Sequence, residues 1–459
     1  MEDKTLQVRL NNKFVGVLQQ DQNGKLIFQY AEKAHQPLSL SLPLESSDNP
    51  NKIYKNDKCK GFFNGLLPES DNVRKAIGKK YGVSPRNDFS LLKAIGYDCA
   101  GAVSFTDVIV GKTPLDELPE YFEIEGKILS DAELEKFITE LPKKPLALGA
   151  DGMRLSLAGA QDKTAVVLID NKVAIPALEV PTTHILKPAI TDLKETVENE
   201  YICMKAAGRM GIDVPDTEIR TVNGIKYFLI QRYDRTIKNG KLKRIHQEDF
   251  CQASNVVSAF KYQAEGGVSF ADCFDVLKKT SRPAVSIVKF LNMMVFNYLI
   301  GNNDAHGKNF SILHYEDSRI ELAPAYDILS TQVYKDLSSK MAMKIGGHYE
   351  PKNIYPRHFE RFANEVGISY VQLKKIIKMQ VFSLPAIVEE VSSSFENSVG
   401  QDILKVVNNN CSSLIKKFEI SDEDLWLFKN KKVQESIRKG LKQSVDGNIS
   451  SLDEEFWNS

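Results

Sequence analysis

Hydrophobic and polar positions along the chain predict a strand-rich beginning that is followed by helices. Residues 5–30 predict short strands joined by tight turns, and Asn23-Gly24 is a strong hairpin signal. Residues 61–95 have the spacing of helices. The segment 111–146 is rich in charged residues and proline, so we expect it to separate this first region from the next.

The pattern predicts strands again from Ser156 onward. TAVVLIDNKVAI predicts a hairpin, THILKP a short strand and IKYFLIQRY a buried strand. A helix over residues 192–210 is predicted between the last two of these strands.

The remaining sequence, after about residue 245, is predicted to be mainly helical. One helix is indicated by apolar residues at helical spacing and by Gly301, a residue type that often ends helices. Those apolar residues are Val285, Val288, Leu291, Val295, Tyr298 and Leu299. FSIL and RIELA then predict a hairpin, and helices return beyond residue 356.

Composition indicates a globular protein with more than one domain. The 459 residues are enough for two or three domains, and 42% are hydrophobic. The net charge is zero, which gives no global electrostatic reason to bind nucleic acid or an anionic membrane. The six cysteines are scattered and form no Cys-x-x-Cys pair, and no signal region or 18-residue apolar run stands out. We therefore expect a cytoplasmic protein without a zinc cluster or a membrane segment.

One loop has the residues that phosphoryl transfer requires. Asp304 and Asn309 have the Asp-x-x-x-x-Asn spacing of kinase catalytic loops, and Asp327 follows after a predicted hairpin. Asp304 would orient or accept the proton of the attacking hydroxyl, and Asn309 and Asp327 would hold Mg²⁺. Spacing alone leaves an alternative open, because a polar turn with an asparagine cap explains the same residues.

Residues upstream of this loop complete a possible nucleotide site. Lys187 in THILKP is the candidate for binding phosphates, and Glu200 on the following helix is its candidate partner. LSLAGAQDKTAVV is the candidate phosphate loop, although a single glycine makes the signal weak. The segment 231–233 ends a buried strand where a hinge would contact adenine. Each feature has an ordinary structural alternative, such as a strand lysine that extends to solvent.

Several motifs, taken in order, resemble the HipA serine/threonine-kinase toxins of bacterial toxin–antitoxin modules. They are PLSLSLPL, FFNGLLPES, GYDCAGAV, SLAGAQDKTAV, THILKP, NEY, QRYDR, QEDFCQ, GNNDAHGKNFSI and APAYDILS. The resemblance covers about residues 5–420 and is far more specific than the catalytic loop alone.

The resemblance implies an α+β, protein-kinase-like fold of two lobes, β-rich at the N-terminus and mostly helical at the C-terminus. It divides the chain into an N-terminal β-rich subdomain (1–110), the remainder of the N-lobe with phosphate loop and hinge (111–240), a helical catalytic C-lobe (241–420) and a charged extension (421–459). The extension has amphipathic spacing, which fits a solvated helix or a partner-binding segment.

The resemblance also implies roles for individual residues. Asp304 matches the catalytic base, and Asn309 and Asp327 match the magnesium ligands. Ser156 matches an autophosphorylation serine whose phosphorylation would silence the kinase. The residues that match the ATP site are Ala158, Gly159, Ala160, Gln161, Asp162, Lys163, Lys187, Gln231, Arg232, Tyr233, His306, Gly307, Lys308, Asn309, Tyr326 and Asp327.

The function implied is phosphorylation of a protein by ATP and Mg²⁺, with an aminoacyl-tRNA synthetase such as the glutamyl enzyme as substrate. This would inhibit translation and favour dormancy, and a HipB-like helix-turn-helix antitoxin would restrain the kinase. Positions that touch operator DNA in a family member correspond here to Asn364 and Gly367, which are not basic, so direct DNA contact is not expected. Alternatives are a non-catalytic co-repressor and a kinase for small molecules or lipids.

Overall fold

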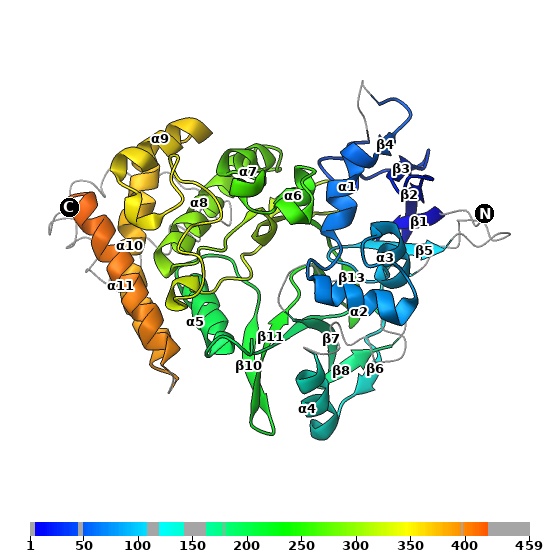
Figure 1. Ribbon diagram of the computed structural model, residues 1–459, viewed down its shortest axis with the longest axis horizontal. Coiled ribbons are helices and arrows are strands. Elements are labelled where there is room, and N and C mark those ends of the chain that lie inside the picture. Colours follow the sequence, from blue (N-terminus) through cyan, green and yellow to red (C-terminus); the bar gives the residue numbers. More distant parts are fainter. Residues whose placement is uncertain are drawn as a thin grey trace.

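The computed structural model describes residues 5–44, 49–107, 119–141, 162–177, 180–395 and 398–420 (Figure 1). Ser156 and four of the predicted phosphate-loop residues, Ala158, Gly159, Ala160 and Gln161, lie outside the described residues, as does the extension 421–459. The described elements form a first domain, a second sheet and a helical part, which follow one another along the chain.

The first domain is an antiparallel sheet covered by helices. Its strand order is β4-β3-β2-β1-β5. The strands are β1 (Thr5–Leu10), β2 (Lys13–Gln20), β3 (Leu26–Tyr30), β4 (Ile53–Lys55) and β5 (Val103–Asp107). Helices α1 (Asn56–Gly65), α2 (Asp71–Tyr81) and α3 (Asp88–Ile95) follow β4. The apolar sides of sheet and helices share one buried core, which is the main stabilising feature of this domain.

The second sheet has the order β10-β11-β9-β7-β8-β6. Its strands are β6 (Gly126–Ile128), β7 (Thr164–Ile169), β8 (Lys172–Pro176), β9 (His184–Pro188), β10 (Thr217–Val222) and β11 (Ile225–Gln231). Helix α4 (Asp131–Glu140) packs on it, and α5 (Thr196–Arg209) connects β9 to β10. The predicted β7–β8 hairpin turns at Asp170 and Asn171, whose φ angles of 48° and 62° suit these residue types.

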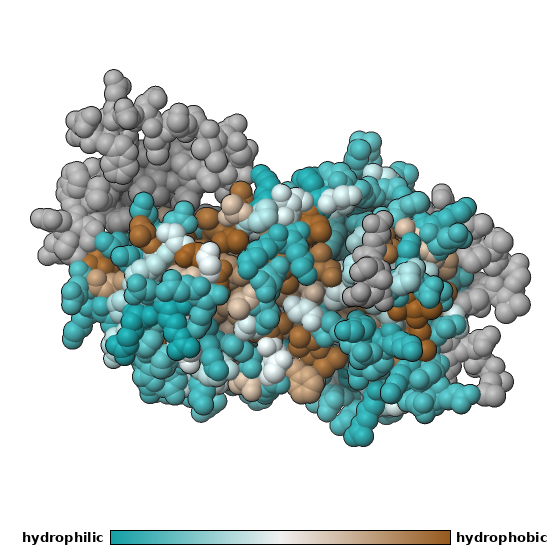
Figure 2. Space-filling view, turned by 90° about the horizontal axis from the view of Figure 1, so that it is seen from above, coloured by the Kyte–Doolittle hydropathy of each residue, from teal (hydrophilic) through white to brown (hydrophobic). Residues whose placement is uncertain are grey.

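Two small sheets lead into the helical part. Strands β12 (Arg235–Lys238) and β13 (Lys241–Arg244) form one hairpin, and β14 (His246–Asp249), β15 (Ser311–His314) and β16 (Ile320–Leu322) form a three-stranded sheet. The α-helices are α6 (Phe250–Ala253), α7 (Phe270–Leu277), α8 (Pro283–Ile300), α9 (Pro356–Val366), α10 (Tyr370–Ser392) and α11 (Val399–Lys417). They pack around a large apolar core. The surface seen from above is mainly hydrophilic with scattered apolar patches (Figure 2).

Helix α8 lies at the centre of this core. It is long and apolar enough, by composition, to cross a membrane, but 61% of it is buried inside the molecule, as in the core helix of a folded domain. It ends at Gly301, as predicted, with a φ of 78° that glycine adopts without strain. The chain then turns directly into the loop that contains Asp304.

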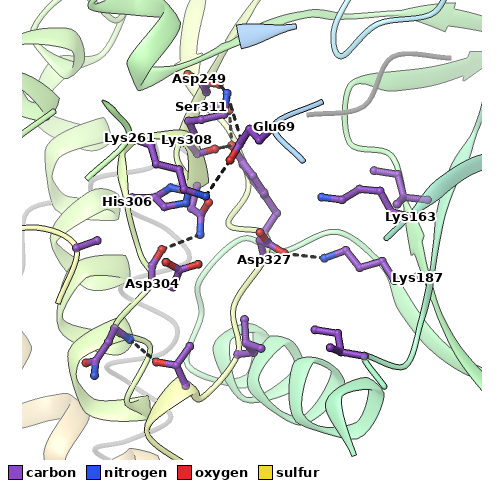
Figure 3. Close-up of a pocket in the computed structure, with 18 of the residues that line it drawn as sticks. Glu69, Lys163, Lys187, Asp249, Lys261, Asp304, His306, Lys308, Ser311 and Asp327 are labelled. Atoms are coloured by element: carbon purple, nitrogen blue, oxygen red, sulfur yellow. Dashed lines mark hydrogen bonds and ion pairs between the residues drawn. The ribbon is translucent and has the colours of Figure 1, made fainter. Parts of the chain in front are cut away.

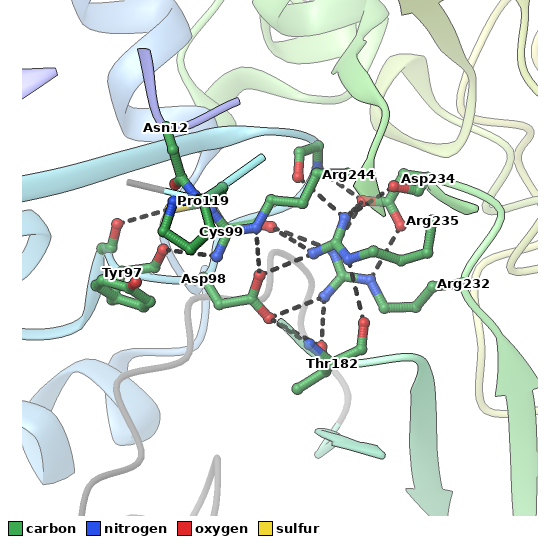
Figure 4. Close-up of polar contacts among 12 residues, drawn as sticks. Asn12, Tyr97, Asp98, Cys99, Pro119, Thr182, Arg232, Asp234, Arg235 and Arg244 are labelled. Atoms are coloured by element: carbon green, nitrogen blue, oxygen red, sulfur yellow. Dashed lines mark hydrogen bonds and ion pairs between the residues drawn. The ribbon is translucent and has the colours of Figure 1, made fainter. Parts of the chain in front are cut away.

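A buried ion cluster joins the first domain to the second sheet (Figure 4). Asp98 of the first domain accepts hydrogen bonds from Arg235 at 2.8 Å and from Thr182 at 2.8 Å. Arg232 donates to Asp234 at 2.7 Å and to the Cys99 carbonyl at 3.1 Å. Because an unpaired buried charge is very costly, these contacts hold the two parts in one arrangement.

Candidate active site

A cavity of about 1010 Å³ lies where the second sheet, the helical part and the first domain meet. Most of the predicted site residues that the structure describes line it, namely Asp162, Lys163, Lys187, Gln231, Arg232, Tyr233, Asp304, His306, Lys308, Asn309, Tyr326 and Asp327. Gly307 lies in the same turn but packs against Cys251 and Val268, where an added Cβ would come within 2.9 Å of the cysteine sulfur. The sequence prediction therefore brought together residues that are up to 165 positions apart.

Lys187 is held between two carboxylates. It lies on β9, and its Nζ donates to Glu200 Oε1 of α5 and to Asp327 Oδ1, both at 2.6 Å. This confirms the predicted pairing of Lys187 with Glu200. Burial opposes the charge of the lysine, but Asp327 and Glu200 outweigh it and raise the pKa of Lys187. The lysine therefore stays protonated, as a phosphate-binding group must.

Asp327 is placed by an unusual backbone conformation. Its φ of 57° lies in the left-handed region, which aspartate tolerates better than most residues. Burial opposes ionisation, but Lys187 and Lys163 lower the pKa of Asp327 below its ordinary value. In Figure 3, Lys163 and Lys187 lie on one side of Asp327, and Glu69, Lys261 and Lys308 lie on the other.

Asp304 is fixed by its own loop and by a tyrosine. The side-chain nitrogen of Asn309 donates to the Asp304 carbonyl at 3.2 Å, and the backbone N–H of His306 donates to the same carbonyl at 2.8 Å. The hydroxyl of Tyr262 donates to Asp304 Oδ1 at 2.7 Å. Burial raises the pKa of Asp304, and the Tyr262 hydrogen bond opposes this. A carboxylate with a raised pKa is suited to accept a proton.

Lys308 and Tyr326 support the loop from behind. Lys308 Nζ donates to Asp249 Oδ2 at 2.7 Å, and both side chains are buried. The Tyr326 hydroxyl donates to the Lys308 carbonyl at 2.6 Å. Burial opposes the charge, but Asp249 and Glu69 raise the pKa of Lys308, so it remains a cation. These contacts fix the turn that presents Asn309.

The predicted hinge contributes unevenly to the cavity. Gln231, Arg232 and Tyr233 all line it, and the Tyr233 ring lies 5.6 Å from that of Tyr326. The Arg232 guanidinium, however, is engaged in the buried ion cluster with Asp234. There Arg232 joins the second sheet to the first domain. The sequence signal for this role was an arginine that directly follows a buried strand and precedes Asp234 by two residues.

Several polar residues of the cavity were not predicted, and four of them contact one another or the predicted residues. Glu69 of the first domain pairs with Lys261 at 2.8 Å, Tyr262 contacts Asp304, and Asp249 pairs with Lys308. Their motifs, FFNGLLPES and QEDFCQ among them, were recognised only as family features. Spacing along the sequence gives no sign that Glu69 meets residues almost 200 positions later.

The donor set fits a magnesium ion that is shared with phosphate oxygens. No group of three His, Cys, Asp or Glu side chains that could hold a metal alone occurs in the described part of the chain. Asn309 uses its amide nitrogen on Asp304, which leaves its oxygen as the possible ligand, and Asp327 lines the same cavity. Mg²⁺ prefers such oxygens and keeps several water or phosphate ligands.

The fold and the cavity define a two-lobed, protein-kinase-like α+β protein with a paired lysine and a loop aspartate at its cleft. Residues 6–106 match the family model of the HipA N-terminal domain, and residues 155–390 match that of the HipA-like C-terminal domain. The chain belongs to the HipA family.

Its relatives agree with this assignment over most of their length. Y4mE of Sinorhizobium fredii, a protein named as a kinase, is 40% identical over 85% of this chain and 92% of its own. The serine/threonine-protein kinase toxin HipA of Shewanella oneidensis is 30% identical over 79% of this chain and 84% of its own. A solved structure of HipA with HipB and operator DNA from Shewanella oneidensis superposes with a TM-score of 0.76 at 26% identity, covering 90% of this chain and 97% of that one.

Proposed function

We propose that the protein is an ATP-dependent serine/threonine kinase that transfers the γ-phosphate to a protein hydroxyl. The observation that supports this best is the convergence of Asp304, Asn309, Asp327 and the Lys187–Glu200 pair on one cavity. A non-catalytic binding module would not need a buried lysine between two carboxylates, because a buried ionic group adds little stability by itself.

Each residue has a distinct part in this proposal. Lys187 and Lys163 neutralise phosphate oxygens, and Gln231 and Tyr233 flank the adenine. Asn309 and Asp327 would hold Mg²⁺, which supplies charge neutralisation of the phosphates. Asp304 accepts the proton of the acceptor hydroxyl as its oxygen attacks phosphorus and the bond to the leaving ADP breaks.

The biological setting is proposed from the relatives. We infer a toxin that phosphorylates an aminoacyl-tRNA synthetase, thereby inhibiting translation and favouring dormancy, and that Ser156, outside the described residues, is its own phosphorylation site. A HipB-like helix-turn-helix antitoxin would bind it, in keeping with the solved complex of the Shewanella oneidensis HipA with HipB and operator DNA. Contact with DNA would be made by the antitoxin, since Asn364 is exposed but uncharged.

Replacement of the base tests the activity. The purified protein is incubated with Mg²⁺ and γ-labelled ATP, alone and with a cell lysate, and labelled protein bands are measured. Asp304→Asn keeps the shape of the side chain but cannot accept a proton, so labelling should fall about 10²–10⁴-fold.

Asp317→Asn is the matched control, because Asp317 is exposed in the β15–β16 turn and should leave labelling unchanged. Nucleotide binding without any phosphate transfer by the unsubstituted protein would contradict the proposal and favour a kinase-shaped co-repressor.

A further inference from the structure

An acidic residue of the first domain reaches the cleft from a rigid loop. Glu69 lies between α1 and α2, directly after Pro68, whose carbonyl accepts from Arg74 Nε at 2.7 Å. Arg74 also pairs with Asp88 at 2.9 Å, and both side chains are largely buried. The backbone around Glu69 is therefore fixed to the first domain by its own contacts.

Two bonds connect this loop and the end of α1 to the segment 258–266 of the helical part. Glu69 Oε2 lies 2.8 Å from Lys261 Nζ, with only 11% and 15% of the two side chains exposed. Asn64 Oδ1 accepts from the Ser258 N–H at 3.0 Å. Burial opposes ionisation, but Lys308 and Lys261 lower the pKa of Glu69, so the contact with Lys261 is between ions.

The segment itself is tightly turned and held from its other side. The Tyr262 carbonyl accepts the N–H groups of Glu265 and Gly267, each at 2.9 Å, and the Gln263 N–H donates to the Ala342 carbonyl at 3.2 Å. With its backbone fixed in this way, Tyr262 directs its hydroxyl at Asp304 Oδ1, and its ring meets the His306 ring edge-on with centroids 5.4 Å apart.

We propose that Glu69 and Tyr262 are positioning residues, through which the first domain holds the catalytic carboxylate in place. Glu69 fixes Lys261, and the neighbouring Tyr262 then keeps its hydroxyl on Asp304 Oδ1, which leaves Oδ2 to accept the proton. The inference rests on the proposed kinase function. Displacement of the base by about 1 Å can lower the reaction rate roughly 100-fold, so the loss of one hydrogen bond to Asp304 can have a large effect on the rate.

The geometry favours positioning over direct chemistry for both residues. The charged groups near Asp304 are Lys261, Asp327 and Glu69. Within the described part of the chain, the side-chain hydrogen bond to the Asp304 carboxylate comes from Tyr262. Glu69 makes its contact with Lys261 and lies farther, at 4.0 Å, from Lys308. Neither residue belongs to the set that would hold phosphates.

The experiment measures steady-state phosphate release from Mg-ATP, with water as acceptor, by the full chain and by Glu69→Gln, Tyr262→Phe and the double variant. We expect each single variant to lower kcat about 10- to 100-fold, with KM for ATP changed by less than about twofold. The double variant should be no slower than the slower single variant, because both changes release the same carboxylate.

Control variants change the same residue types elsewhere. Glu390→Gln removes an exposed partner of Arg209, and Tyr370→Phe removes a hydroxyl that bonds the Pro356 carbonyl. Both should behave like the unsubstituted protein. If Glu69→Gln does not fold by circular dichroism, Lys261→Gln breaks the same ion pair from its other side and is measured instead.

The outcomes separate this inference from the proposed function. An unsubstituted protein that transfers phosphate neither to water nor, in the labelling experiment, to protein contradicts the kinase proposal itself. If it labels protein without releasing phosphate, the labelling rates of the variants are compared instead. An active protein whose variants keep full kcat overturns the positioning role, and so do effects of the two substitutions that multiply in the double variant. A faster Tyr262→Phe protein also overturns it, because the hydroxyl would then be occupying the place of the acceptor.

Discussion

Lys187 depends strongly on its surroundings, because it bridges Glu200 and Asp327 while only 5% of its side chain is exposed. The spacing of strand lysine and helix glutamate was enough to predict its first partner. The contact with the second partner, 140 residues later, was not predicted, because the motif around Asp327 indicated only a magnesium ligand. Pairing within neighbouring elements is encoded locally, whereas contacts between distant elements need the whole fold.

Replacement of Lys187 should cost both activity and stability. Lys187→Met leaves two carboxylates without their cation, so we expect loss of phosphate transfer and a fall of about 3–5 kcal/mol in the free energy of unfolding. Urea denaturation measures the second effect.

Lys226 on β11 offers a matched comparison, because it pairs with Glu198 on the same helix α5 but is 54% exposed. Lys226→Met should change the free energy of unfolding by less than about 1 kcal/mol. Equal losses of unfolding free energy for the two variants would show that the buried pairing of Lys187 adds no more stability than the exposed pair of Lys226.

At the scale of elements, the end of α8 determines where the loop with Asp304 begins. The Gly301 carbonyl accepts from Thr331 Oγ1 and from the Gln332 N–H, both at 3.1 Å, which ties the turn to the segment after Asp327. The helix and its glycine end were predictable from spacing. The tie to Thr331 was not, because a hydroxyl 30 residues away has no periodic signature.

Substitution of Gly301 should therefore affect function as well as stability. An alanine at φ 78° costs about 1–2 kcal/mol, and its Cβ would lie 2.6 Å from a methyl carbon of Val406. We expect Gly301→Ala to lower the unfolding free energy and to reduce kcat.

Gly367→Ala is the control for this substitution. Gly367 ends α9 with a similar φ of 74° and has no atom within 4 Å of an added Cβ. The two sites share only the backbone strain of a positive φ, so Gly367→Ala should cost less stability than Gly301→Ala and should leave kcat unchanged. A parallel drop in kcat would mean that the loop does not depend on the end of α8.

At the scale of the whole molecule, the first domain is docked by buried polar contacts. Glu248 of β14 accepts from the Leu40 N–H at 2.9 Å and from His314 at 2.8 Å, and His246 Nε2 donates to the Leu38 carbonyl at 2.7 Å. The motif PLSLSLPL was predicted only as a family feature. Its docking role is a property of the assembled chain that strand and helix patterns do not encode.

Acid should weaken this docking. Burial first, and then His314, lower the pKa of His246 to about 4, although the Leu38 carbonyl, Glu248 and Asp234 oppose this. In the unfolded chain His246 binds a proton as the pH falls through about 6.5, whereas in the folded chain it stays neutral until about pH 4. The unfolding free energy should therefore fall as pH decreases through this window, by about 3 kcal/mol from His246 alone.

The comparison of unfolding at pH 7 and pH 4 measures this contribution. His246→Gln keeps an N–H donor for Leu38 but does not titrate, so its loss between the two pH values should be smaller than that of the unsubstituted protein. The exposed His35→Gln variant should leave the loss unchanged. If the unfolding free energy depended on pH identically in all three proteins, the assignment of this loss to His246 would be contradicted.

The distance along the chain between Glu69 and Asp327 has a consequence for the nascent protein. The ribosome releases the acidic residue of the first domain about 260 residues before the last carboxylate of the cleft, which at ordinary synthesis rates is a delay of roughly 13–50 s. Throughout that interval the growing chain has no complete site. Under the proposed function, the kinase would thus be inert while it is being made, and the proposed antitoxin would have that time to be synthesised beside it.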